Sequence, residues 1–264
     1  MRIGILEAVR IASIGQVVFG VVVLALGVVG VIKPDYMPLW QAPEHVPLAL
    51  VYLCEVVSIA CGIAMLVPRT AALAARVFFG YLALWSLVFR IYDIVTGPTE
   101  FGSWDGCAEA GVIVAGAWLL YARLATDWDR KHVGFLVGET AVRIARALYG
   151  IAMIPFGLAH FLYLDRTVSM VPGWLPAHLA WACLTGGAFI AAGVAILVGV
   201  WARLAAMLSV VQIGAFLVLV WIPMIANGPI DPFEWVEVGM SAALMAAGWI
   251  VAESYRIRSD ALGA

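Results

Sequence analysis

The chain contains eight apolar stretches, each near the length of about 20 residues that an α-helix needs to cross a bilayer. Only 12% of its residues are charged and 64% are hydrophobic, whereas a soluble domain has about 25% charged residues. The pattern excludes a soluble globular domain and predicts an all-α, polytopic membrane protein with eight transmembrane helices. The expected spans are residues 11–32, 46–67, 70–95, 106–124, 143–164, 177–199, 201–226 and 234–253.

The basic residues are unevenly distributed between the two sides of the predicted bundle. Of the 15 lysines and arginines, Lys33, Arg90 and Arg166 fall on one side, and the other 12 fall at the termini or in the second, fourth and sixth connections. Because Lys and Arg are enriched in cytoplasmic loops, both termini are predicted to be cytoplasmic. The first stretch is longer than the apolar core of a signal peptide and lacks a small-residue cleavage site, so we expect it to remain as a helix.

Two halves of the chain align at a constant offset, the one that pairs Ile59 with Ile190. The segment IACGIAMLV at 59–67 then matches IAAGVAILV at 190–198. Because each half holds four spans, an even number, both halves enter the membrane in the same direction and form a parallel repeat. We therefore predict a four-helix repeat over 1–125, a cytoplasmic linker over 126–140 and a second four-helix repeat over 141–264. The same offset pairs Gly97-Pro98 with Gly228-Pro229, Trp104 with Trp235, and Trp118 with Trp249.

Four ionisable residues, Glu55, Arg90, Asp93 and Glu109, fall in the outer half of the first repeat. Glu55 lies well inside the second span, where an ionised carboxylate is costly unless it is paired or protonated. Arg90 and Asp93 are three residues apart and share a helix face. We hypothesise that the four converge on a polar pocket open to the non-cytoplasmic side, with Glu55 available for proton exchange. The alternatives are a structural ion pair that fixes helix register, or residues hydrated at the interface.

The second repeat does not reproduce this polar set, because Gly186 stands at the position equivalent to Glu55 and Trp221 at that of Arg90. Either this half is a scaffold, or it builds a different site from other ionisable residues. His160, near the outer end of the fifth span, would shuttle protons or contact a quinone carbonyl; the alternative is a hydrogen-bonded packing residue. The residues available for a second-repeat site are His160, Asp165, His178, Glu234 and Glu237.

Known cofactor motifs are not recognisable in the sequence. The four cysteines form no CxxC pair, and the four histidines offer no matched axial pair for haem. No P-loop, GxSxG, HExxH or GxGxxG motif occurs in the context that its chemistry needs. We therefore predict no metal site and no intrinsic cofactor. The net charge of −2 gives no reason to expect nucleic acid.

Two segments resemble the DoxX-like integral membrane proteins. From Cys54 to Arg76 the chain reads CEVVSIACGIAMLVPRTAALAAR, which is similar to the second helix of that family, where a Glu precedes a Gly-rich apolar run ending in a basic turn. From Val171 to Leu197 it reads VPGWLPAHLAWACLTGGAFIAAGVAIL, which is similar to the corresponding loop and helix. DoxX-like proteins are usually four-helix units, so the chain resembles two of them fused. The resemblance implies an inner (plasma) membrane protein and, for some relatives, quinone-linked sulfur or thiol oxidation.

Three functions are compatible with the sequence. The first is a membrane subunit or partner of a quinone-linked oxidoreductase, with the redox centre carried by another membrane or redox protein. The second is a small-molecule or lipid transporter with a cavity between the two repeats. The third is a structural membrane scaffold that binds its partners through Gly-rich helix faces. The sequence does not decide whether the chain is itself an enzyme.

Overall fold

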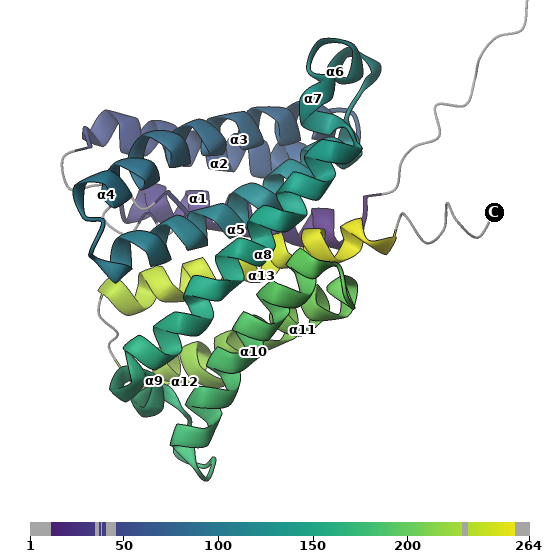
Figure 1. Cartoon of the computed structure of the whole chain (residues 1–264). Coiled ribbons are helices and arrows are strands. Elements are labelled where there is room, and N and C mark those ends of the chain that lie inside the picture. Colours follow the sequence, from purple (N-terminus) through teal and green to yellow (C-terminus); the bar gives the residue numbers. More distant parts are fainter. Residues whose placement is uncertain (1–11, 35–36, 38, 41–45, 229–231, 257–264) are drawn as a thin grey trace, which may run out of the picture.

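The computed structural model describes residues 12–34, 37, 39–40, 46–228 and 232–256. Within these residues the regular structure is entirely helical, without a strand. Eight helices of the described chain are long and apolar enough to span a membrane. The predicted all-α, polytopic membrane fold is therefore confirmed (Figure 1). Arg2, Arg10 and Arg258 of the charge pattern, and Pro229 of the repeat comparison, lie outside the described residues.

Six spans are single helices, and two contain a π-helical segment. The single helices are α1 (Ile14–Ile32), α2 (Leu48–Leu66), α5 (Phe101–Leu124), α8 (Glu139–Leu162), α10 (His178–Val198) and α13 (Pro232–Ser254). The third span joins α3 (Ala71–Trp85), the π-helix η1 (Ser86–Arg90) and α4 (Ile91–Thr96), and the seventh joins α11 (Ala202–Phe216), the π-helix η2 (Leu217–Trp221) and α12 (Ile222–Asn227). Shorter helices outside the spans are α6 (Asp127–His132), α7 (Gly134–Val137) and α9 (Leu164–Met170).

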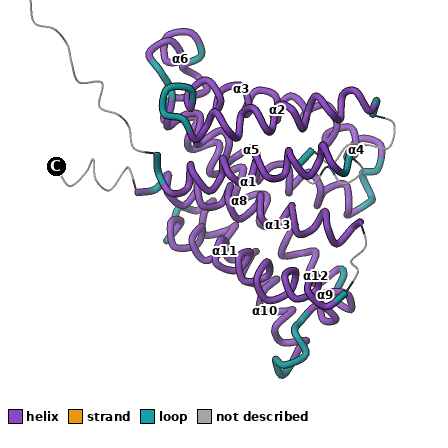
Figure 2. Tube along the Cα trace, turned by 180° about the vertical axis from the view of Figure 1, so that it is seen from behind, coloured by secondary structure: helices purple, strands orange, loops and turns teal. Residues whose placement is uncertain are grey.

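The eight spans run between two ends of the molecule, which Figures 1 and 2 show from opposite sides. The helices α6 and α7 lie at one end, with the start of α1 and the end of α13; we call this the linker end. The helices α4, α9 and α12 lie at the other, which we call the loop end. The first half of the chain, α1 to α5, meets the second half, α8 to α13, where α5 packs on α8 and α13, and α13 packs on α1.

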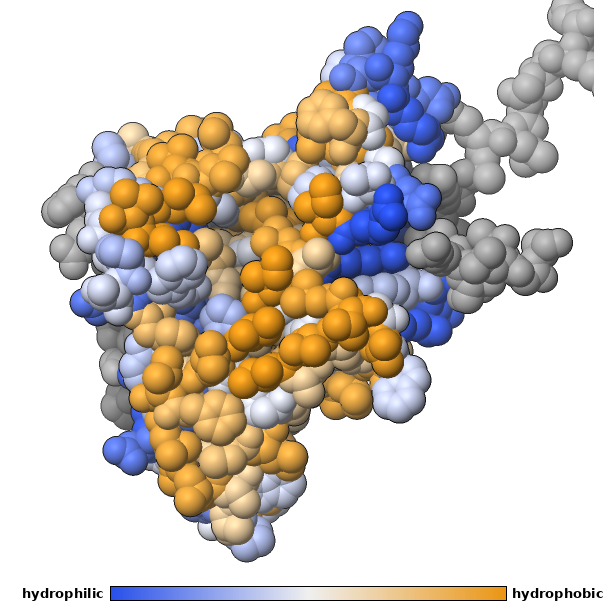
Figure 3. All heavy atoms as spheres, in the orientation of Figure 1, coloured by the Kyte–Doolittle hydropathy of each residue, from blue (hydrophilic) through white to orange (hydrophobic). Residues whose placement is uncertain are grey.

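Large apolar side chains point outward along the spans. Leu84, Leu87 and Val211 are each more than half exposed in the isolated chain. Exposed apolar side chains are costly in water but suit contact with lipid tails, which are apolar themselves. The backbone also suits a bilayer, because each helix satisfies its own hydrogen bonds. Figure 3 shows the corresponding hydrophobic surface over the middle of the molecule, with hydrophilic residues gathered at its ends. The outer surface is therefore that of a membrane-embedded bundle.

The two halves share an irregularity in their third spans. The π-helical segments start at Ser86 and Leu217, and the helices before them start at Ala71 and Ala202. Both pairs are separated by the same offset that pairs Ile59 with Ile190 in the sequence. A π-helical segment is rare and widens one turn of a helix. Its occurrence at matched positions means that the third spans of the two halves carry the same irregularity in the same place.

The first and second spans of each half cross through glycines. A Cβ on Gly20 would lie 3.2 Å from the carbonyl oxygen of Gly62, and a Cβ on Gly150 would lie 3.1 Å from that of Gly193. In the sequence, Gly62 and Gly193 are as far apart as Ile59 and Ile190, which define the offset of the repeat. Gly20 and Gly150 are one residue closer together than this offset. The first spans therefore align one residue out of step with the rest of the repeat. Small residues at these crossings let the backbones approach closely, as helix packing in lipid favours.

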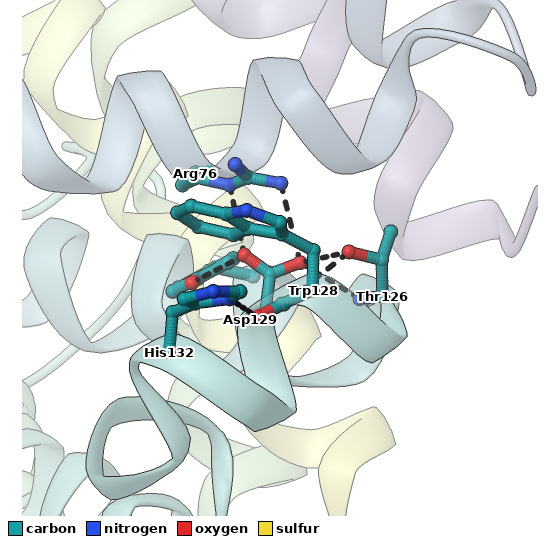
Figure 4. Close-up of polar contacts among 6 residues, drawn as sticks. Arg76, Thr126, Trp128, Asp129 and His132 are labelled. Atoms are coloured by element: carbon teal, nitrogen blue, oxygen red, sulfur yellow. Dashed lines mark hydrogen bonds and ion pairs between the residues drawn. The ribbon is translucent and has the colours of Figure 1, made fainter.

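The predicted linker is held against the first half by Asp129, which is fully buried (Figure 4). Its carboxylate lies 2.8 Å from Nε of Arg76 and accepts hydrogen bonds from the hydroxyls of Tyr121 and Thr126 at 2.8 and 2.6 Å. The Arg76 guanidinium also stacks over the ring of Trp128. Thr126 and Asp129 form a capping box that begins α6. One carboxylate thus joins α3, α5 and α6.

A second polar cluster at the linker end connects the two halves. Arg123, at the end of α5, lies 3.0 Å from the carboxylate of Glu253 on α13. It also donates a hydrogen bond to the hydroxyl of Ser13. Glu253 accepts a further bond from the backbone N–H of Gly15 at 3.0 Å. The ends of α5 and α13 are therefore fixed to the beginning of α1.

Candidate functional site

A cavity of about 1170 Å³ lies in the loop-end part of the bundle, where the two halves meet. Typical small-molecule sites in proteins measure about 300–1000 Å³, so the space is large enough for an organic ligand. We call it the central cavity. Its walls come from both halves: the first contributes residues of α2, η1 and α5, and the second contributes residues of α8, α9, α10, α11, η2 and α13.

Helical spacing explains how two of these walls form. Residues three and four apart lie on the same face of an α-helix. Along α5 this face carries Gly102, Asp105, Gly106 and Glu109. Along α8 the same spacing places Phe156, Ala159 and His160 toward the cavity, and Tyr163, directly after the end of α8, also lines it.

The second half supplies an aromatic wall around His160. The ring of His160 lies 5.5 Å from that of Phe189 and is stacked on Phe216 at 5.9 Å, and Phe156 packs on Phe189 at 6.2 Å. The Nδ1 of His160 is 2.7 Å from the carbonyl oxygen of Phe156. Because a carbonyl can only accept, Nδ1 carries the proton, and Nε2 of the neutral ring is an acceptor. A hydrogen bond to a quinone carbonyl would therefore require the doubly protonated ring.

Charged side chains also line the central cavity. The guanidinium of Arg90, which lines the cavity, lies 3.1 Å from the carboxylate of Asp93, three residues further along the same span. Asp105 has one buried carboxylate oxygen with no hydrogen-bond partner among the described residues. Glu237 interacts electrostatically with both Asp105 and Arg166. The cavity thus combines an aromatic wall with carboxylates from α5 and α13, the fourth spans of the two halves.

The five residues singled out from the sequence do not form one pocket. Arg90, Glu109 and His160 line the central cavity. Asp93 does not line it but pairs with Arg90, beside a smaller recess next to α5. Glu55 does not line it either; Val51, one helical turn away, does. The structure thus places His160 of the second half on the same cavity as Arg90 and Glu109 of the first, and places Glu55 and Asp93 outside its wall.

Glu55 is enclosed between α2 and α1. It is 1% exposed, and neither carboxylate oxygen has a hydrogen-bond partner among the described residues. Gly30 of α1 provides the space for it, since a Cβ on Gly30 would overlap the carboxyl group. In the second half His160 stands at the position equivalent to Gly30, and Gly186 at the position equivalent to Glu55. A Cβ on Gly186 would lie 2.7 Å from the Cβ of His160. Each half thus holds one ionisable side chain at this crossing, but on opposite helices.

This complementarity predicts a coupling between Gly30 and Glu55. Replacing Gly30 by alanine should destabilise the protein by about 1 kcal/mol, because the added methyl displaces the end of the buried but flexible Glu55 side chain. Adding Glu55→Ala should recover most of that loss, since the space is vacated. Thermal unfolding in detergent measures both effects. Gly111→Ala is the control, because its Cβ would make only ordinary contacts at 3.6 Å; additive losses in the double variant would contradict the coupling.

Sequence reasoning missed Asp105 and Arg166 as cavity residues and assigned Glu237 to a separate second-half site. The spacing of Asp105 and Glu109, one helical turn apart, was the available signal on α5. Arg166 lies on α9, a short helix after the fifth span that hydropathy does not reveal. Three other residues considered for a second-half site, Asp165, His178 and Glu234, are not part of the cavity wall.

Comparisons with protein-family models, with curated proteins and with solved structures gave no match. Among the residues that the structure describes, no three His, Cys, Asp or Glu side chains come together in a way that could hold a metal ion.

Proposed function

We propose that this chain is a multi-pass membrane protein that binds a small organic molecule in the central cavity and transports it. The observation that carries the proposal is the cavity itself, with a volume of about 1170 Å³ and walls from both halves. A cavity between two packed halves can change its opening when one half moves against the other. The aromatic and charged walls suit an amphipathic ligand.

The orientation and the membrane are part of the same proposal. The excess of Lys and Arg at the linker end supports a cytoplasmic location for that end. The loop end, and with it the central cavity, would then face the non-cytoplasmic side. The resemblance to DoxX-like proteins supports the inner (plasma) membrane and a tandem pair of four-helix repeats, and the matched π-helical segments of the third spans are consistent with such a duplication.

A DoxX-like, quinone-linked role with a membrane or redox protein partner is the second candidate. Ser241 and Arg166 line the cavity, and the hydroxyl of Ser241 and the guanidinium of Arg166 could donate hydrogen bonds to quinone carbonyls. The rings of Phe189 and Phe216 would pack on the quinone ring. A bound quinone would supply two-electron redox chemistry; the chain's own residues would bind and orient it. Identification of the bound molecule separates this role from transport of another compound.

Filling the cavity tests the proposal. Replacing Ala159, on the α8 wall, by tryptophan should remove most of the bound small molecule, because the indole occupies ligand space. The measurement is mass spectrometry of small molecules retained after native purification in mild detergent. Leu84→Trp is the matched control, since Leu84 is 58% exposed on the lipid-facing surface. Wild-type protein without a bound small molecule, or equal occupancy in Ala159→Trp, would contradict the proposal.

A further inference from the structure

We infer that the ligand of the central cavity is an organic cation, a protonated or quaternary amine carried on an apolar body. The inference rests on the proposed function and adds the chemical class of the ligand to it. Four features of the cavity support this: an excess of carboxylates, an acidic pair from two helices, an aromatic wall and an acceptor nitrogen on His160.

Among the described residues that line the cavity, acidic side chains outnumber basic ones. In the described part of the wall the basic residues are Arg90 and Arg166, and Asp93, which pairs with Arg90 at 3.1 Å, offsets the charge of Arg90. The wall also carries three carboxylates, those of Asp105, Glu109 and Glu237. Excess negative charge inside a bundle surrounded by lipid is costly, because the low dielectric strengthens the repulsion between carboxylates. A positively charged ligand would relieve that repulsion, whereas an anion would increase it.

The acidic pair marks the place where the positive charge would lie. Asp105 on α5 and Glu237 on α13 are close enough to interact electrostatically. Asp105 has a buried oxygen without a hydrogen-bond partner among the described residues. An ammonium group near this pair would supply both the charge and, when it is protonated rather than quaternary, an N–H donor for that oxygen.

The aromatic wall suits the same ligand. Phe156, Phe189 and Phe216 line the cavity together with residues of α5 and α13. Aromatic rings attract cations through their faces and also pack on apolar groups. When the His160 ring is neutral, the hydrogen bond from its Nδ1 to the carbonyl of Phe156 leaves Nε2 as an acceptor for a protonated amine. These groups favour a cation with a hydrophobic body over a neutral carbonyl compound.

A bare metal ion does not fit these observations. No three potential metal-ligating side chains of His, Cys, Asp or Glu come together within the described part of the chain. An ion would also leave most of a cavity of about 1170 Å³ unfilled. The size and the apolar walls therefore point to an organic cation.

Two probes of similar size and shape but opposite charge test the inference. Equilibrium dialysis of the full chain in neutral detergent would compare tetraphenylphosphonium, a cation, with tetraphenylborate, an anion. Tetraphenylphosphonium is expected to bind saturably, and tetraphenylborate is not. Each of Asp105→Asn and Glu237→Gln should weaken binding of the cation by about tenfold, because each removes one carboxylate charge while keeping the side-chain shape. Asp165→Asn, an exposed change at the same end, should leave it unchanged.

Three results would contradict the inference that the ligand is an organic cation. They are equal binding of the two probes, no binding of the cation, and wild-type affinity for the cation in both carboxylate variants. The thermal stability of each variant shows whether it is folded, and the two single substitutions serve as independent tests. The co-purification experiment distinguishes this failure from failure of the proposed function. If Ala159→Trp displaces a bound molecule that is neutral or anionic, the inference of a cationic ligand is wrong and the proposed function stands. If Ala159→Trp does not displace the bound molecule, the proposed function is wrong.

Discussion

Gly116→Val is expected to destabilise the protein by more than about 3 kcal/mol and to disrupt the central cavity. Gly116 lies where α5 crosses α13, and a Cβ there would lie 2.7 Å from the Cα of Ala247 and 2.9 Å from its carbonyl oxygen. These are backbone atoms, which cannot move aside as the end of a flexible side chain can. The two helices would have to separate. Thermal unfolding in detergent and binding of the co-purified molecule would both report the loss.

Gly80→Val is the matched control for this prediction. Gly80 lies in α3 on the outer surface, and a Cβ there would meet no atom within 4 Å. The same substitution should therefore change the stability by less than about 1 kcal/mol. Similar stability of the two valine variants would show that α5 and α13 do not pack through Gly116. The result matters for function because α5 and α13 carry Asp105 and Glu237.

Asp129→Ala is expected to release the linker from the first half at a cost of about 3 kcal/mol. The substitution leaves Arg76 and Tyr121 without the carboxylate that both contact. Arg76 is 30% exposed, so water replaces part of the lost interaction and the cost should be at the lower end for a buried ion pair. Limited proteolysis between α5 and α8 would measure the release. Asp127→Ala is the control, because Asp127 is fully exposed; equal cleavage of the two variants would contradict the role of Asp129.

Acid should have the same effect as the Asp129 substitution. Burial alone would raise the pKa of Asp129, but the hydrogen bonds from Thr126 and Tyr121 and the charge of Arg76 outweigh it and hold the pKa below the ordinary value of 3.8. A carboxyl whose folded-state pKa is lowered stabilises the fold above its unfolded-state pKa, and this contribution disappears as the pH falls through the folded value. The linker should therefore stay docked at neutral pH and become cleavable only below about pH 3.8. Asp129→Asn should remove this pH dependence.

The sequence located the spans well but placed the start of the fourth too late. Hydropathy predicted residues 106–124, whereas α5 begins at Phe101. The missed turn contains Trp104 and Asp105, which lower the hydropathy of the segment. Hydropathy assumes that a span faces lipid, and Asp105 instead faces an internal cavity. The error thus falls on a residue of the candidate site.

The repeat comparison was similarly incomplete. A single fixed offset matched Glu55 with Gly186 and indicated that the second half had lost this ionisable position. The first spans align one position out of step with that offset, which places His160 at the position of Gly30. The exchange of glycine and ionisable residue between the two crossings was visible only once the helix contacts were known.

The sequence by itself determined the number and approximate position of the spans, because a bilayer requires about 20 consecutive apolar residues in a helix that satisfies its own backbone. Only the tertiary structure decided which ionisable groups meet. Arg90, Glu109, His160 and Glu237 come from distant parts of the chain, and their shared cavity depends on how each helix is rotated about its axis. That rotation is set by close crossings at glycines such as Gly116, where backbone contact between helices, rather than hydropathy, fixes the geometry.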